Sequence, residues 1–151
     1  MSEFCKISWD FDDTLAMEFA GAWGGTEVYP IETFVELLKE YHALGCECII
    51  LTARTPSEHN KYEIEYFLKK CDVAHCISDI HFTYNQPKGP FAHKLGVHLH
   101  YDDSMVHLIS VAQHGIRVVN SLKAEARANP KLDIGDKFDG LRDFIQMTYS
   151  N

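Results

Sequence analysis

The fold is decided by one stretch of the sequence, Ile7-Ser8-Trp9-Asp10-Phe11-Asp12-Asp13-Thr14-Leu15, in which an apolar run ends in three acidic residues. Aromatic and β-branched residues favour strands, so a strand is expected over residues 4–9, with Asp10 where it stops. Ligands of open α/β sheets bind at this carboxyl edge. Carboxylates crowd there when a cation lies between them, and Mg²⁺ suits such hard oxygen ligands. The alternative is an acidic surface turn without a chemical role.

A second apolar run, residues 46–51, ends in Thr52, and Arg54 lies in the loop that follows. A threonine hydroxyl at a strand end can donate a hydrogen bond to a bound phosphate. Arg54 has two interpretations that the sequence leaves open. Its planar fork suits a phosphate or another substrate oxyanion, and it would equally serve as a solvated loop arginine.

A third strand is expected over residues 97–101, and it is followed by Asp102, Asp103 and Ser104. Adjacent carboxylates can belong to a site at the sheet edge. They can also favour the start of a helix, which is expected over residues 104–114. His98 and His100 share a strand face with Asp102, which allows a transition-metal site, although histidines beside an acidic cleft more often line or tune it.

The pattern Asp10-x-Asp12-x-Thr14 after an apolar strand resembles the first motif of the haloacid dehalogenase superfamily. The family's later motifs are a strand ending in Ser or Thr, a lysine at a helix start, and a strand ending in an acidic pair. They are matched in order over residues 4–120 by Thr52, Lys88 and the pair Asp102 and Asp103. The chain departs from the family at Asp13, where many members carry glycine.

The family's lysine often stands beside a proline, which assigns the role to Lys88 in the breaker-rich loop 85–90. Lys94 falls inside the short helix expected over residues 91–95 and is interpreted as a surface residue. Functional residues concentrate in loops at a site, which also favours Lys88.

The resemblance implies a Mg²⁺-dependent phosphatase in which Asp10 is the nucleophile and Asp12 the general acid and base. Mg²⁺ would be held by Asp10, by a backbone carbonyl at Asp12 and by Asp103. Asp102 would orient or neutralise the lysine, or replace Asp103 at the metal. Thr52 and Lys88 would complete the phosphate cradle. Thr14, Arg54 and Trp23 are the expected substrate contacts.

Strands alternate with helices along the chain, which predicts an α/β fold with a parallel sheet and right-handed crossovers. The expected architecture is a three-layer Rossmann-like domain over residues 1–151, with about five strands flanked by helices. Helices are expected over residues 31–43, from the Thr55 cap onward, and over 141–149. Further strands are expected over 77–82 and 116–119. Gly45 and Gly115 are expected to end helices.

The segment 19–30 is rich in aromatic residues and glycine and is predicted to be a loop. Trp23 in it would face the substrate as a flap, or anchor the loop on the core. Neither this interval nor the one from Thr52 to Lys88 can hold a cap domain, which needs at least about 50 residues. The resemblance therefore implies a capless member with an open cleft, which admits a large substrate or is covered by a neighbouring subunit.

Composition limits the remaining possibilities. A chain of 151 residues that is 46% hydrophobic can bury the core of one domain. The net charge of −8 argues against a broad nucleic-acid or membrane footprint. Five cysteines without a C-x-x-C motif fit reduced thiols in the cytoplasm. No apolar run approaches the roughly 20 residues that span a bilayer.

The predicted function is hydrolysis of a phosphomonoester through an aspartyl-phosphate, on a phosphorylated metabolite or a macromolecule end. Two alternatives stay open. The same chemistry would serve a nucleotidase or a phosphatase of nucleic-acid ends, whose binding would weaken steeply with salt. A regulatory domain without catalysis could also use this fold, because fold does not fix function.

Overall fold

A five-stranded parallel sheet forms the centre of the molecule in the computed structural model, which describes residues 5–20 and 26–122. Its strand order is β5-β4-β1-β6-β7, and every neighbouring pair is parallel. The strands are β1 (Lys6–Trp9), β4 (Glu47–Thr52), β5 (Ile77–Phe82), β6 (Leu99–Asp102) and β7 (Arg117–Asn120). The predicted α/β class and the number of strands are confirmed.

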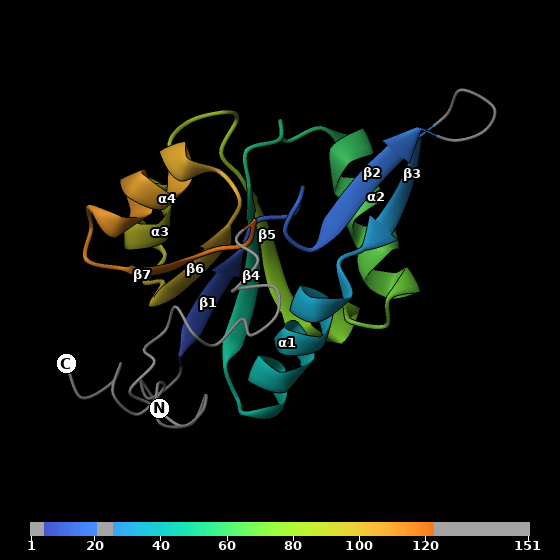
Figure 1. Cartoon of the computed structure of the whole chain (residues 1–151), viewed down its shortest axis with the longest axis horizontal. Helices are drawn as coiled ribbons and strands as arrows, with labels where there is room; N and C mark the ends of the chain where they lie inside the picture. The colour runs from blue at the N-terminus through green and yellow to red at the C-terminus, as the bar shows by residue number, and fades with distance from the viewer. Residues whose placement is uncertain (1–4, 21–25, 123–151) are drawn as a thin grey trace.

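Helices cover both faces of this sheet and make three layers (Figure 1). Helices α1 (Glu32–Ala43) and α2 (Glu58–Lys70) pack with the larger apolar cluster, to which Trp9 and Tyr101 belong. Helices α3 (Gly89–Lys94) and α4 (Met105–Ala112) lie on the other face, against Ile49 and Leu51. A short 3₁₀ helix, η1 (Ala74–Cys76), leads from α2 into β5.

The two faces of the central strands differ in polarity. Side chains alternate along a strand, and Ile7 and Trp9 of β1 therefore face the apolar cluster under α1 and α2. The residue between them, Ser8, points to the opposite face, as do His100 and Asp102 of β6. All three polar side chains are fully buried. The face beneath α3 and α4 thus carries a buried polar strip across two adjacent strands.

The segment 19–30 corrects one prediction, because residues 19–20 and 26–30 lie in paired strands and not in a loop. Strands β2 (Ala16–Ala20) and β3 (Thr26–Pro30) pair antiparallel, with Ala16 opposite Pro30. Thr26, Val28 and Tyr29 favour extended backbone, and their preference outweighs the neighbouring glycines on which the loop prediction rested. Trp23 and the helix expected over residues 141–149 lie outside the described residues.

The start of α2 also differs from the prediction. Ser57, and not Thr55, caps the helix, since its Oγ accepts a hydrogen bond from the Asn60 amide at 3.1 Å. Thr55 lies outside the helix and accepts from the Asn60 side-chain amide through its carbonyl and its hydroxyl, each at 3.0 Å. The remaining expected helices and strands begin and end within about two residues of their predicted bounds, the usual scatter of such assignments.

The described residues contain no cap domain. Between the end of β1 and α1 they form only the β2–β3 hairpin, and between β4 and Lys88 only α2, η1 and β5. The carboxyl end of β1 is therefore bordered by a hairpin and loops, and not by a second domain. None of the helices described is both long and apolar enough to cross a membrane.

Candidate active site

Three central strands bring the predicted residues to one edge of the sheet. Asp10 directly follows β1, Thr52 is the last residue of β4, and Asp102 is the last residue of β6. The Asp10 amide donates to the Tyr101 carbonyl oxygen at 2.9 Å, which continues the pairing of β1 with β6. Because the carboxyl ends of parallel strands meet at one edge of the sheet, Asp10 and Asp102 lie close together although they are more than 90 positions apart in the chain.

Lys88 links the two buried carboxylates. Its Nζ donates to Asp10 Oδ1 at 2.8 Å and to Asp102 Oδ2 at 2.7 Å, and only 1% of its side chain is exposed. Burial disfavours the charged ammonium, but the two carboxylates outweigh this effect and raise the pKa of Lys88. Lys94 is exposed on α3. The structure therefore places Lys88, and not Lys94, among the predicted site residues.

The backbone next to Lys88 is held tightly against α4. Lys88 is the N-cap of α3, and the Gly89 amide donates to Ser110 Oγ at 2.9 Å. A Cβ at position 89 would overlap the carbonyl oxygen of Ser110, which is backbone and cannot turn aside. Glycine is thus required here for close approach, and this contact fixes the origin of the Lys88 side chain.

A buried hydrogen-bond chain continues from Lys88 across β6 and β1. His100 Nε2 lies 2.8 Å from Asp102 Oδ2, and His100 Nδ1 lies 2.7 Å from Ser8 Oγ. Burial lowers the pKa of His100, which favours the neutral ring. A carboxylate only accepts, so Nε2 carries the proton, and the Ser8 hydroxyl donates to Nδ1. Both ring nitrogens of His100 therefore have protein partners, which favours the expectation that this histidine tunes the acidic cleft over the transition-metal alternative.

Asp102 is held in its ionised form by this surrounding. Burial alone would raise its pKa, but the hydrogen bond from His100 and the charge of Lys88 hold it below its usual range. Its second oxygen, Oδ1, accepts from the Ser104 amide at 3.0 Å. Asp102 therefore uses both oxygens on protein donors and fits the predicted lysine-orienting role better than a metal-ligand role.

Asp10 and Asp103 could together bind a divalent cation. Carboxylate oxygens of Asp10, Asp102 and Asp103 lie within 4.8 Å of one another. Burial raises the pKa of both Asp10 and Asp103, and the nearby charge of Asp102 adds to the rise in each. A divalent cation between Asp10 and Asp103 would stabilise their charged forms and lower both pKa values. Hard oxygen ligands in this number fit Mg²⁺, which keeps several water ligands.

Arg54 is bound by protein groups, which contradicts its interpretation as a solvated loop residue. Its Nε and Nη2 donate to the two oxygens of Asp12 at 2.8 and 2.7 Å. Nη1 donates to Asn60 and Glu63, and Nη2 also contacts Glu18 Oε1 at 3.4 Å. These contacts occupy all five N–H donors of the guanidinium. Arg54 is therefore neither a solvated loop residue nor a group that presents donors to phosphate in this conformation; it orients Asp12.

Thr14 and Thr52 are both buried at the same edge. The Thr14 hydroxyl lies 2.8 Å from Ser121 Oγ and 3.5 Å from Asp10 Oδ2. The Thr14 hydroxyl thus ties the Asp10 loop to Ser121, directly after β7, and its expected contact with the substrate stays a prediction. Thr52 Oγ1 accepts from the Arg54 amide at 3.3 Å, and its hydroxyl proton can still be donated to a ligand.

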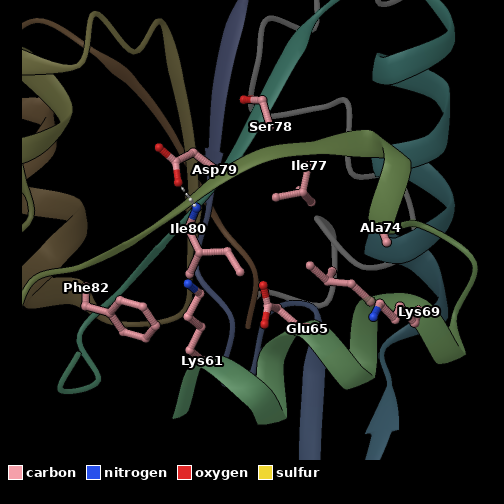
Figure 2. A pocket seen from close by; sticks show the side chains of 10 residues that line it. Lys61, Glu65, Lys69, Ala74, Ile77, Ser78, Asp79, Ile80 and Phe82 are labelled. Atoms are coloured by element: carbon pink, nitrogen blue, oxygen red, sulfur yellow. Dashed lines mark hydrogen bonds between the residues drawn. The ribbon is translucent and has the colours of Figure 1, made fainter. Parts of the chain in front are cut away.

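A hollow lies on the flank of the molecule, away from these carboxylates. It has a volume of about 400 Å³ and is formed between α2 and the edge strand β5 (Figure 2). Lys61, Glu65 and Lys69 line it from the helix, while Ser78 and Asp79 lie on the strand. None of the predicted site residues lines this hollow, so it has no part in the chemistry proposed below.

Comparisons with known proteins find similar folds but no similar sequences. No protein-family model and no curated protein sequence matches the chain. Among solved structures, a Vibrio cholerae protein provisionally named 3-deoxy-D-manno-octulosonate 8-phosphate phosphatase matches 98% of this chain and 86% of its own, with a TM-score of 0.53 and 15% identity.

The phosphatase of the same name from Moraxella catarrhalis, solved with magnesium, phosphate and KDO, matches 83% of this chain and 73% of its own. Its TM-score is 0.52 and its identity 17%. At such identities the likeness concerns the fold, and Asp10, Asp102 and Lys88 lie at the sheet edge where the sequence motifs predicted the site. The chain shares its fold with these two solved structures.

Proposed function

We propose that the protein is a Mg²⁺-dependent phosphomonoester hydrolase that acts through an aspartyl-phosphate on Asp10. The observation that carries the proposal is the buried ion triad in which Lys88 joins Asp10 and Asp102 at the sheet edge. An ammonium held there can offset the charge that a phosphate brings next to two carboxylates. The fold shared with named phosphatases supports the same reaction class.

In the first step, an oxygen of Asp10 attacks phosphorus, and the bond from phosphorus to the ester oxygen breaks. Lys88 fixes Asp10 through Oδ1, which orients the carboxylate for in-line attack. Asp12 gives its proton to the departing alcohol. Before that, its carboxyl must turn from the Arg54 fork and take up a proton from solvent, and the 43% exposure of the Asp12 side chain leaves room for this rotation.

In the second step, Asp12 takes a proton from water, and the water oxygen attacks phosphorus. The bond between phosphorus and Asp10 then breaks and phosphate leaves. Lys88 and Thr52 are the chain's own groups that can hold the phosphoryl oxygens at this edge. When bound by Asp10 and Asp103, Mg²⁺ would supply further positive charge to those oxygens.

The test is hydrolysis of an aryl phosphate with and without Mg²⁺ by the wild type and by Asp10→Asn. The wild type should turn over only with Mg²⁺, and the nearly isosteric variant should be inactive while keeping the fold. Appreciable activity of the pure variant, or full wild-type activity in a chelator, would refute the proposal. A panel of phosphorylated metabolites, nucleotides and oligonucleotide ends would then identify the substrate class.

A further inference from the structure

A cluster of metal-ligand side chains lies at the opposite edge of the sheet. His42 is in the last turn of α1, whereas His75 and Cys76 belong to η1, directly before β5 begins. The nucleophile Asp10 follows the carboxyl end of β1, whereas these three residues precede the amino ends of β4 and β5. The cluster is therefore separate from the candidate active site.

The ligand atoms of the three residues converge. The two imidazole nitrogens and the Cys76 sulfur all lie within 4.8 Å of one another. His75 Nε2 is 3.6 Å from Cys76 Sγ, and the rings of His42 and His75 meet edge to face with centroids 5.3 Å apart. Tetrahedral Zn²⁺ separates neighbouring N and S ligands by about 3.4–3.8 Å, given its usual bond lengths. The spacing between His75 and Cys76 already matches this value.

We propose that His42, His75 and Cys76 bind a Zn²⁺ ion that clamps the end of α1 to the start of β5. Sulfur and imidazole nitrogen select Zn²⁺ and its neighbours over the hard cations that carboxylates prefer. Cys76 is only 3% exposed and fixes one ligand on the core, while both histidines are exposed and can rotate onto the metal. Three protein ligands leave the fourth position to water.

Binding at this site has a defined proton balance. Burial raises the pKa of the Cys76 thiol, and the charge of Asp72 adds to the rise, while Lys39 opposes it. The thiol is thus protonated in the free protein, and a bound metal replaces that proton, which passes to the buffer. The metal–sulfur and two metal–nitrogen bonds that form replace metal–water bonds of the hydrated ion, without any change of oxidation state.

Titration with Co²⁺, which replaces Zn²⁺ and absorbs light, tests the proposal. The reduced protein is saturated with Mg²⁺ first, so that the carboxylates at the active site are occupied. One equivalent of Co²⁺ should produce thiolate-to-cobalt absorption in the near ultraviolet, and Zn²⁺ should displace it. His42→Ala and His75→Ala should each weaken binding at least about tenfold, since each loses one of three protein ligands.

The matched control is the exposed pair His93 and His114, whose rings stack with centroids 5.0 Å apart. Changing both to alanine should leave the Co²⁺ titration unchanged. Zn²⁺ should also raise the melting temperature of the wild type and of this control, but not of a variant lacking His42 and His75. Cys76→Ser should abolish the thiolate band; if this buried change unfolds the chain, the two surface histidine variants decide the outcome.

Absence of the thiolate band in the wild type would overturn the proposal. So would binding that is unaffected by both His42→Ala and His75→Ala, since the metal would then lie elsewhere. A titration abolished by the His93 and His114 control would reassign the site to that pair.

Discussion

Replacement of Lys88 by methionine tests the buried ion triad directly. The variant keeps the length of the side chain but leaves Asp10 and Asp102 without their shared counter-charge, and these carboxylates are 8% and 0% exposed. Removing one partner of a buried ion pair costs about 3–5 kcal/mol. We therefore expect the free energy of unfolding to fall by about that amount at pH 7. Lys94→Met, on the exposed side of α3, should change it by less than about 0.5 kcal/mol.

The loss should depend on pH in a defined direction. In the wild type, Asp102 has a lowered pKa, so it contributes stability above the ordinary carboxyl pKa that is lost as the pH falls through its folded pKa. Without Lys88 the pKa of both carboxylates rises, and they take up protons at higher pH. The difference between variant and wild type should thus shrink as the pH falls from 7 toward the ordinary carboxyl pKa.

Urea unfolding at several pH values, followed by circular dichroism, measures these differences. Mg²⁺ should restore part of the lost stability at pH 7, because a cation between Asp10 and Asp103 supplies charge near the same carboxylates. A Lys88→Met variant as stable as the wild type at pH 7 would refute the reasoning. So would equal losses for Lys88→Met and Lys94→Met.

Substitutions at four further residues separate their roles. Asp103→Asn should raise the Mg²⁺ concentration for half-maximal activity at least about tenfold, because it removes a charged ligand; Asp102→Asn should lower the melting temperature more than Asp103→Asn does. Arg54→Lys should lower kcat on the order of 10²-fold with little change in KM, since the fork that positions the ionised Asp12 for the second, water-activating step is lost; a rise in KM alone would assign Arg54 to phosphate binding. Asp13→Gly should keep full activity, whereas Asp13→Val should lose about 1–2 kcal/mol of stability, because φ is +64° at this position; equal stability of the two variants in urea would contradict this.

The sequence predicted the strand-end residues because each motif is local. An apolar run that stops at an acid or a threonine indicates both a strand and its end, so Asp10, Thr52 and Asp102 could be placed without a structure. For Asp13 the sequence shows only a departure from the glycine that many members of the resembled family carry. Its left-handed backbone, with φ of +64°, is a conformation that favours glycine.

Partners set by tertiary packing could not be predicted in this way. Arg54 and Asp12 are 42 positions apart, and only the packing of two loops turns one toward the other. Ser8 looks like an ordinary strand residue until β6 brings His100 against it. Its polar character at the centre of an apolar strand was the available signal. Ser121 gave no comparable signal, since serine after a strand is common in turns.

The guanidinium of Arg54 links the β2–β3 hairpin to Asp12, the proposed general acid. It holds Asp12 from one side and Glu18 of β2 from another. A ligand that draws Asp12 away from Arg54 changes the free energy with which Arg54 binds Glu18 of the hairpin. Displacement of the hairpin changes the free energy of separating Asp12 from Arg54 by the same amount. A contact on the hairpin, although distant from the reacting phosphorus, would therefore change how readily Asp12 donates its proton.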